Sequence, residues 1–190
     1  MRELAGRRSR ARDRLCGGGV AGAGLRTATM GEIAIASAVD EADEAWLADL
    51  WRESWGDVIV VSRGRVHRLS DVSALIARQG GKRVGAATYH LEGEAAELTS
   101  LNAVTSGKGI GSALIAAVEN AVRAAGARRL WLITTNDNVD ALRFYQRRGF
   151  RLVRLHAGVV DEARRIKPAI PEIGEHCIPI HDEIELEKWL

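Results

Sequence analysis

A glycine-rich run past the middle of the chain restricts the fold more than any other feature. Residues Gly107–Ser112 read GKGIGS and connect a strand-like segment, 97–104, to a long helical pattern. Glycine lacks a Cβ, so such a loop adopts unusual dihedrals and lets a ligand approach its backbone closely. The first turn of the helix adds unpaired N–H groups and a positive dipole end. The run therefore predicts a phosphate-binding loop or, in the simplest interpretation, a strand-to-helix turn only.

The common phosphate-binding motifs fit this run poorly. In a P-loop a hydroxyl residue follows the Gly-Lys pair, and here Gly109 stands in that place. The dinucleotide-binding fingerprint needs a glycine or alanine three residues after Gly109, and that residue is Ser112. The run also lies too far along the chain for the early βαβ unit of that fingerprint. The motif alone leaves the identity of the phosphate-bearing cofactor open.

The composition is that of one ordinary globular domain. The chain has 190 residues, of which 46% are apolar and 27% are charged. No apolar run approaches the roughly 20 residues that cross a bilayer, so we expect no membrane partner. Cys16 and Cys177 lie in unrelated contexts, which favours a reducing, cytoplasmic compartment over a disulfide framework. His176, Cys177 and His181 have no second ligand cluster to support them, and we expect no metal.

The first 29 residues differ from the rest of the chain. They hold seven arginines against two acidic residues and are rich in glycine, so we expect a disordered head. The head is a nucleic-acid tail, a targeting peptide or an upstream start, and we favour Met30 as the natural start. Residues 30–190 form the predicted domain and carry 20 basic and 23 acidic residues, which argues against nucleic-acid binding by that domain.

Hydrophobic periodicity predicts an α/β (α+β) protein with a mixed, mostly antiparallel central sheet and helices on both of its faces. Residues 157–182 hold all three prolines and are expected to be a long irregular insertion. Asp71 is expected to begin a short helical or irregular piece. The predicted strands are 32–38, 74–78, 82–91, 94–104, 130–134, 150–156 and 184–190, with a short β-branched run at 58–61; the predicted helices are 40–52, 110–125 and 138–148.

A second motif narrows the function. Asn138 is followed by Ala141 three residues later, Tyr145 four residues after that, and then Gly149-Phe150. This pattern resembles the last conserved motif of the N-acetyltransferases of the GNAT superfamily, and Gly107–Ser112 resembles their acyl-CoA pyrophosphate loop. The resemblance covers about residues 31–156, with 184–190 as the terminal strand. It implies the acyl-CoA N-acyltransferase fold, with acetyl-CoA as co-substrate and no metal.

The resemblance also implies a set of cofactor-binding residues. Ser106 stands where the superfamily usually has Arg or Gln, so the loop would rely on its N–H groups and on Lys108. Asn138 would orient the cofactor, although asparagine is also a good helix N-cap. The strand ending at 101–104 would part from 130–134 and leave backbone groups free for the pantetheine arm. The implied cofactor-binding residues are Leu101, Ala103, Val104, Gly107, Lys108, Gly109, Ile110, Gly111, Ser112, Asn138, Ala141 and Tyr145.

Two residues are implied to be catalytic. Tyr145 would protonate the departing thiolate, since a phenol with a pKa near 10 is protonated at neutral pH. A primary amine has a pKa of about 10.4, so a base must remove its proton. Glu97 lies where some members have a catalytic glutamate, although its simplest interpretation is a solvent-facing strand residue. A water chain or Asp137 could serve instead.

The resemblance implies an acetyl-CoA-dependent N-acetyltransferase that acetylates a primary amine of a small molecule or peptide by direct transfer in a ternary complex. A domain that binds acyl-CoA without catalysis and a nucleotide-binding regulatory module are the alternatives, and a homodimer stays open. Residues 58–72 and 157–182 are expected to set specificity. The acidic residues within 172–187 are most simply a solvated surface, or else a rim that attracts a cationic amine.

Overall fold

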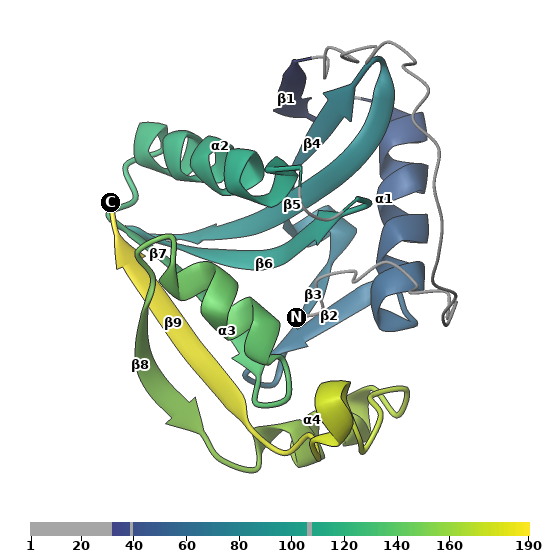
Figure 1. The fold of residues 1–190 in the computed structure, drawn as a ribbon, viewed down its shortest axis with the longest axis vertical. Coiled ribbons are helices and arrows are strands. Elements are labelled where there is room, and N and C mark those ends of the chain that lie inside the picture. Colours follow the sequence, from purple (N-terminus) through teal and green to yellow (C-terminus); the bar gives the residue numbers. More distant parts are fainter. Residues whose placement is uncertain (1–31, 39, 106–107) are drawn as a thin grey trace, which may run out of the picture.

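The computed structural model describes residues 32–38, 40–105 and 108–190. They form a seven-stranded sheet with the strand order β1-β4-β5-β6-β7-β9-β8 and a separate two-stranded hairpin, β2-β3 (Figure 1). The strands are β1 (Ile33–Ser37), β2 (Ile59–Ser62), β3 (Arg65–Arg68), β4 (Ser73–Gln79), β5 (Lys82–Glu92), β6 (Ala95–Ala103), β7 (Arg129–Thr135), β8 (Arg151–His156) and β9 (Glu183–Trp189). The helices are α1 (Glu41–Trp55), α2 (Ile110–Ala124), α3 (Val139–Gln146) and α4 (Val159–Ile166), with short 3₁₀ turns η1 (Leu69–Asp71) and η2 (Glu175–Cys177).

The sheet has the predicted mixed character. Strands β6 and β7 are parallel and are connected through α2, while the other neighbouring strands are antiparallel. Side chains alternate between the two faces of a strand, so neighbouring residues of β4 and β5 pack against different helices. The predicted α/β fold with a mostly antiparallel sheet is therefore confirmed.

Helices cover both faces of the sheet, as predicted (Figure 1). On one face, Leu47 and Leu50 of α1 pack against Ile76 and Ala86. The main hydrophobic core lies on the other face, where α2 and α3 pack. Its members include Leu75, Ala77, Ala87, Leu98, Leu114, Val118, Val122, Leu130, Leu132, Ala141, Tyr145 and Leu186.

Strands β6 and β7 pair over a short stretch only. Their described pairs run from Ala95 with Arg129 to Glu97 with Trp131, and beyond Glu97 the described residues of the two strands form no pair. Thr99 is an extra residue on β6, because Thr88 faces Ser100 while Tyr89 faces Leu98. Such a bulge bends a strand and increases its twist. The predicted separation of 101–104 from 130–134 is confirmed.

The hairpin β2-β3 was missed as a pair of strands. Only its first half had been noted, as the β-branched run 58–61. Arg63 and Gly64 connect the strands with φ of 48° and 74°, the left-handed region that suits a tight hairpin turn. Asp71 ends the 3₁₀ turn η1 rather than beginning it, and its carboxylate accepts the N–H of Arg68. Arg65 and Arg68 make the second strand look like a polar loop.

Residues 157–182 are more ordered in structure than the expected irregular insertion. They contain α4, which begins after Gly158 at φ 73°. The guanidinium of Arg164 donates to the carbonyl oxygens of Ile170, Pro171 and Ile180, and so ties the following segment to the helix. This helix has only eight residues, and its polar residues lie close together, which is why the sequence did not predict it.

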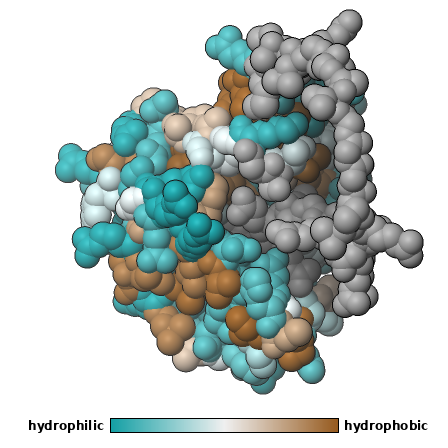
Figure 2. All heavy atoms as spheres, in the orientation of Figure 1, coloured by the Kyte–Doolittle hydropathy of each residue, from teal (hydrophilic) through white to brown (hydrophobic). Residues whose placement is uncertain are grey.

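Strand β8 forms one edge of the sheet and exposes apolar side chains. Leu152, Val153 and Leu155 are exposed, and Trp189 is exposed on neighbouring β9. Figure 2 shows apolar residues gathered over the part of the surface that β8 occupies in Figure 1. Within the described ranges, no helix is both long enough and apolar enough to cross a bilayer. The predicted head, residues 1–29, and Gly107 lie outside the described residues.

Candidate functional site

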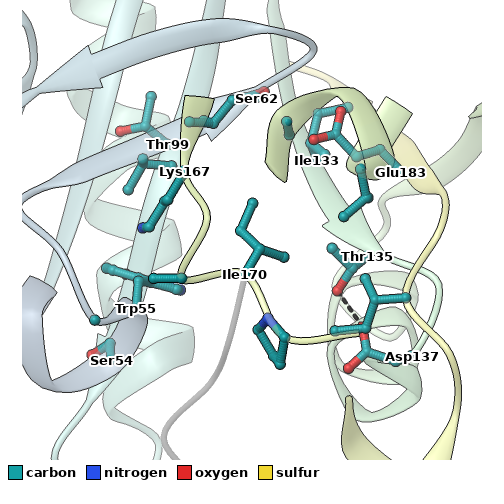
Figure 3. A pocket seen from close by; sticks show the side chains of 18 of the residues that line it. Ser54, Trp55, Ser62, Thr99, Ile133, Thr135, Asp137, Lys167, Ile170 and Glu183 are labelled. Atoms are coloured by element: carbon teal, nitrogen blue, oxygen red, sulfur yellow. Dashed lines mark hydrogen bonds between the residues drawn. The ribbon is translucent and has the colours of Figure 1, made fainter. Parts of the chain in front are cut away.

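A cavity of about 510 Å³ opens where β6 and β7 part. Its walls come from the end of α1, from β2, from the facing sides of β6 and β7, from α4 and the segment after it, and from β9. Figure 3 shows Trp55, Thr99 and Lys167 on one side and Ile133, Thr135 and Glu183 on the other, with Ile170 between them. The cavity thus joins an apolar wall to several buried ionisable groups.

Glu97 lines this cavity and is only 4% exposed. The simple interpretation of Glu97 as a solvent-facing residue is therefore wrong. Its Oε2 lies 3.1 Å from Nε2 of the buried His67, which β3 contributes. Their relative orientation does not make a hydrogen bond, and Nε2 has no other partner among the described residues. Glu97 is thus a buried carboxylate at the cavity wall, within reach of a group that binds there, and such a position suits a general base.

Strand β9 brings two further buried carboxylates to this side of the sheet. The carboxylate of Glu183 accepts the backbone N–H of Arg63 at 2.9 Å. Burial raises the pKa of the Glu183 carboxyl, and the negative charge of Glu97 raises it further, against the hydrogen bond from Arg63. For Glu185, burial also opposes ionisation, but hydrogen bonds from His156 and Arg129 lower its pKa overall. The simplest interpretation of both acids, a solvated surface, is therefore wrong, and the alternative of acids that attract a cationic amine stays a prediction.

Asp137 lies at the end of β7 and holds the segment that follows α4. Its carboxylate accepts the Thr135 hydroxyl at 2.5 Å and the Glu175 N–H at 2.8 Å. A Cβ on Gly174 would lie 1.9 Å from Oδ2 of Asp137, so only glycine allows this approach. These bonds give Asp137 a structural role and make it a poorer candidate for the base than Glu97.

The opposite face of the sheet carries the predicted cofactor loop. Gly109 is the N-cap of α2 with φ 76°, and among the described residues no side chain caps the first N–H groups of the helix. Gly111 also serves packing, because a Cβ there would lie 2.9 Å from Cζ of Phe144. Lys108 is exposed, while the Ile110 side chain is fully buried in the core.

Only some of the backbone N–H groups of β6 face the predicted pantetheine site. Val104 donates its N–H to the carbonyl of Val84 at 2.9 Å, so that N–H is not available to a cofactor. Alternate N–H groups of a strand point to opposite neighbours. The N–H groups of Leu101 and Ala103 therefore point toward β7, where the described strands do not pair.

Helix α3 holds the second predicted motif. The side chain of Asn138 caps the helix by accepting the N–H of Ala141 at 2.9 Å, and both residues are buried. Tyr145 is 3% exposed and lies between Phe144 and Phe150, with ring centroids 5.2 and 5.6 Å away. Tyr145 belongs to the core on the α2 and α3 face, whereas Glu97 lines the cavity on the other face.

Arg148 is a candidate that the sequence did not reveal. Its guanidinium donates to the Ser112 hydroxyl at 3.1 and 2.6 Å and to the Phe144 carbonyl at 2.7 Å. It also lies 3.4 Å from the centroid of the Phe144 ring. A cation therefore stands beside the first turn of α2. The i, i+4 spacing from Phe144 was the one available signal, and it does not show which helix Arg148 faces.

Asp140, Glu175 and His176 each bring one potential metal-ligand atom within 4.8 Å of the others. Asp140 and His176 are exposed, and none of the three lines the cavity. Exposed groups of this kind are common without an ion, so the cluster does not define a site. His176 has these neighbours rather than Cys177 and His181, the residues that had been weighed from the sequence.

Comparisons of the sequence relate this chain to a known family. The model of the Acetyltransferase (GNAT) family matches residues 35–150. Two uncharacterized Bacillus subtilis (strain 168) proteins, YdhI and YxbD, are 38% identical over 143 residues and 39% identical over 141 residues. These matches cover 75% and 74% of this chain and 89% of each relative.

Solved structures share the fold. The IAA acetyltransferase from Bacillus cereus ATCC 14579 has a TM-score of 0.64 at 21% identity, over 84% of this chain and 100% of that one. A GNAT family acetyltransferase from Elizabethkingia anophelis with acetyl-CoA bound has a TM-score of 0.64 at 20% identity, over 83% of this chain and 98% of that one. The family match spans more than half of the chain and includes both sequence motifs. This chain belongs to the acetyltransferase (GNAT) family.

Proposed function

We propose that the chain is an acetyl-CoA-dependent N-acetyltransferase that acetylates a primary amine by direct transfer within a ternary complex. The observation that carries the proposal is the separation of β6 from β7 beside the buried carboxylate of Glu97. The uncapped start of α2 and Tyr145 lie on the opposite face. Acetyl-CoA in the Elizabethkingia anophelis protein supports the choice of donor. Family membership does not favour a nucleotide-binding regulatory module.

In the proposed mechanism the acceptor amine enters from the cavity and the thioester from the α2 side. Glu97 takes a proton from the ammonium, and the free amine attacks the thioester carbonyl to form the new N–C bond. The N–H groups of Leu101 and Ala103, which point toward the gap, stabilise the developing oxyanion. The C–S bond then breaks, the thiolate takes a proton from the Tyr145 hydroxyl, and the attacking nitrogen loses its second proton, which returns to the tyrosinate through solvent. The products are an amide and CoA.

The donor is tested by calorimetry with acetyl-CoA, CoA, ATP and NAD on the full chain. We expect heat from acetyl-CoA and CoA, because the α2 N-terminus offers N–H donors to a pyrophosphate. Heat from ATP but not from acetyl-CoA would reject the proposal. Release of free thiol with a panel of primary amines then tests turnover, and binding without release on any amine would favour a non-catalytic acyl-CoA-binding domain.

Tyr145→Phe tests the proposed acid. Loss of a proton donor to the thiolate is expected to lower kcat about 100-fold or more, the range for general acid catalysis. The Kd for acetyl-CoA should stay within about twofold, since the ring keeps its packing against Phe144 and Phe150. The chain has one other tyrosine, Tyr89, and Tyr89→Phe is the matched control. Equal activity of both variants would remove Tyr145 from the mechanism.

Arg148→Gln tests the cation beside the cofactor loop. We expect the Kd for acetyl-CoA to rise about 10-fold, because a hydrogen bond from a charged donor contributes roughly 1.5 kcal/mol or more. The same variant should weaken CoA to a similar degree but not pantetheine, which lacks the pyrophosphate. Arg147→Gln is the control, since Arg147 is the exposed neighbour. An unchanged Kd for CoA would show that Arg148 only joins α3 to Ser112.

A further inference from the structure

Three glutamates line one face of β9 at alternate positions, and two of them have cationic partners. The Arg129 guanidinium bonds Glu185 and Glu187 at 2.6 Å each. Glu185 also contacts Arg63 at 3.3 Å and His156 at 3.0 Å. Alternate residues of a strand share a face, so Glu183 belongs to the same row. Two of the three glutamates therefore have cationic partners, and the third, Glu183, lies at the cavity.

Glu183 has no ion pair within the described part of the chain. Its carboxylate accepts one main-chain N–H, from Arg63, and its side chain is 3% exposed. A buried carboxylate is costly unless a cation and hydrogen bonds compensate it. Glu183 lines the cavity, so a bound ligand can reach it. A cation that enters the cavity would supply the partner that the described residues do not give Glu183.

A second buried polar group at the cavity also lacks a partner. The hydroxyl of Ser62, at the end of β2, is buried and makes no hydrogen bond with the described residues. Ser62 precedes Arg63, whose N–H holds Glu183, and both Ser62 and Glu183 line the cavity. A hydroxyl oxygen and a carboxylate together accept hydrogen bonds from an ammonium group. This end of the cavity is thus equipped for a cation with several N–H donors.

Glu97 and Glu183, two of the carboxylates that line the cavity, stand at different heights along β7. Glu97 pairs with Trp131, whereas Glu183 pairs with Thr135, four residues further along. At about 3.3 Å per residue, their backbone positions differ by roughly 13 Å along the strand. Ile133 lies between these heights, and Trp55 and Ile170 line the same space (Figure 3). Glu97 and Glu183 thus lie at either end of an apolar stretch of the wall, while Asp137 and Glu53 also line the cavity.

Lys167 is a buried cation on the cavity wall, and it would neutralise Glu183 if the two side chains met. Its ammonium donates to the Ile59 carbonyl at 2.9 Å, which holds it on the β2 side. Burial lowers the pKa of Lys167, with Asp57 acting in the opposite direction. In Figure 3, Lys167 and Glu183 lie on opposite sides of Ile170. Lys167 therefore does not neutralise Glu183.

We propose that Glu183 and Ser62 bind a second cationic group of the acceptor, which makes the acceptor a diamine. One nitrogen lies beside Glu97 and is acetylated, the other is held by Glu183, and a short apolar spacer contacts the wall between them. The inference rests on the proposed acetyltransferase function. It goes further by assigning a substrate class and a residue that selects it.

Direct binding tests the diamine site without requiring turnover. α,ω-Diamines from diaminopropane to diaminooctane and their monoamine counterparts are titrated calorimetrically into the full chain in the presence of CoA. We expect the best diamine to bind about 10- to 100-fold more tightly than its monoamine, the range for a charged hydrogen-bonded pair. Glu183→Gln should remove this preference and leave the monoamine Kd within a few fold.

Glu187→Gln is the matched control. It removes the same charge from the same face of β9, but Glu187 is partnered by Arg129 and does not line the cavity. It should leave the preference for diamines unchanged. Thermal unfolding of Glu183→Gln checks the fold, and Ser62→Ala provides a second variant that should weaken diamines selectively. Equal Kd values for diamines and monoamines, no diamine binding, or equal effects of Glu183→Gln and Glu187→Gln would overturn the inference.

The acetyltransferase proposal and the diamine-site proposal can be rejected separately. If acetyl-CoA binds and monoamines release thiol as fast as diamines, the acetyltransferase proposal stands and the diamine site is wrong. If diamines bind through Glu183 but no amine releases thiol, the site stands as a binding site and the proposed activity fails.

Discussion

Replacing Glu97 by glutamine is expected to lower kcat by about 100- to 10,000-fold, the range contributed by a positioned general base. The amide keeps the size of the side chain in its buried position on β6 but cannot accept the proton of an ammonium. The Kd for acetyl-CoA should change little, because the cofactor loop lies on the other face of the sheet. The measurements are steady-state thiol release and calorimetry with acetyl-CoA.

The loss should also depend on pH in a characteristic way. With the base removed, the residual rate should rise with pH toward the pKa of the acceptor, since only the neutral fraction of the amine reacts. Glu94→Gln is the control, because Glu94 is exposed just before the same strand. If Glu97→Gln keeps more than about a tenth of the wild-type kcat, a water chain rather than Glu97 removes the proton.

The largest expected loss of stability follows from Asp43→Ala. Asp43 lies in the first turn of α1 and is fully buried. Its carboxylate forms ion pairs with the guanidinium groups of Arg78 of β4, at 2.5 Å, and of Arg83 of β5, at 2.8 Å. Removing one partner of a buried charged group costs about 3–5 kcal/mol, and we expect the low end because both arginines are partly exposed. About 3 kcal/mol corresponds to a fall in Tm of roughly 6–12 °C for a chain of this size.

Urea unfolding followed by tryptophan fluorescence measures this change, with thermal unfolding as a second method. Asp49→Ala is the matched control on the same helix, because the ion pair of Asp49 with Arg52 is exposed on both sides. It should change the free energy of unfolding by less than about 0.5 kcal/mol. Equal effects of the two substitutions would mean that the Asp43 cluster does not attach α1 to the sheet.

Local sequence patterns predicted most of the strands and helices of this fold. The strands of the large sheet and the helices α1 to α3 were accessible from hydrophobic periodicity, and the parting of β6 from β7 was implied by the resemblance that two short motifs carry. The tight packing of Gly111 against Phe144 was not accessible, since it depends on how α3 crosses α2. The second strand of the hairpin was missed because Arg65 and Arg68 make it look like a polar loop. Helix α4 was missed because its eight residues span little more than two turns, too few for a helical period to stand out.

The cavity itself could not be read from the sequence. Arg63 meets Glu183 across a sequence separation of 120 residues. His67 meets Glu97 only because β3 folds over the sheet. Because of such contacts, acidic residues that look solvent-exposed in the sequence are buried in the structure and become candidates for function. The roles given to Tyr145, Glu97, Asn138 and the loop glycines remain predictions.

The parting of β6 from β7 also has a mechanical meaning. Three described residue pairs join the block β1-β4-β5-β6 to the block β7-β9-β8, so the sheet consists of two plates connected at a short seam. Glu97 is the last paired residue of that seam on β6, and the cavity draws walls from both plates. A small change in the angle between the plates would therefore alter the width of the cavity while leaving Glu97 almost in place. Substrates of different size could thus meet the same carboxylate.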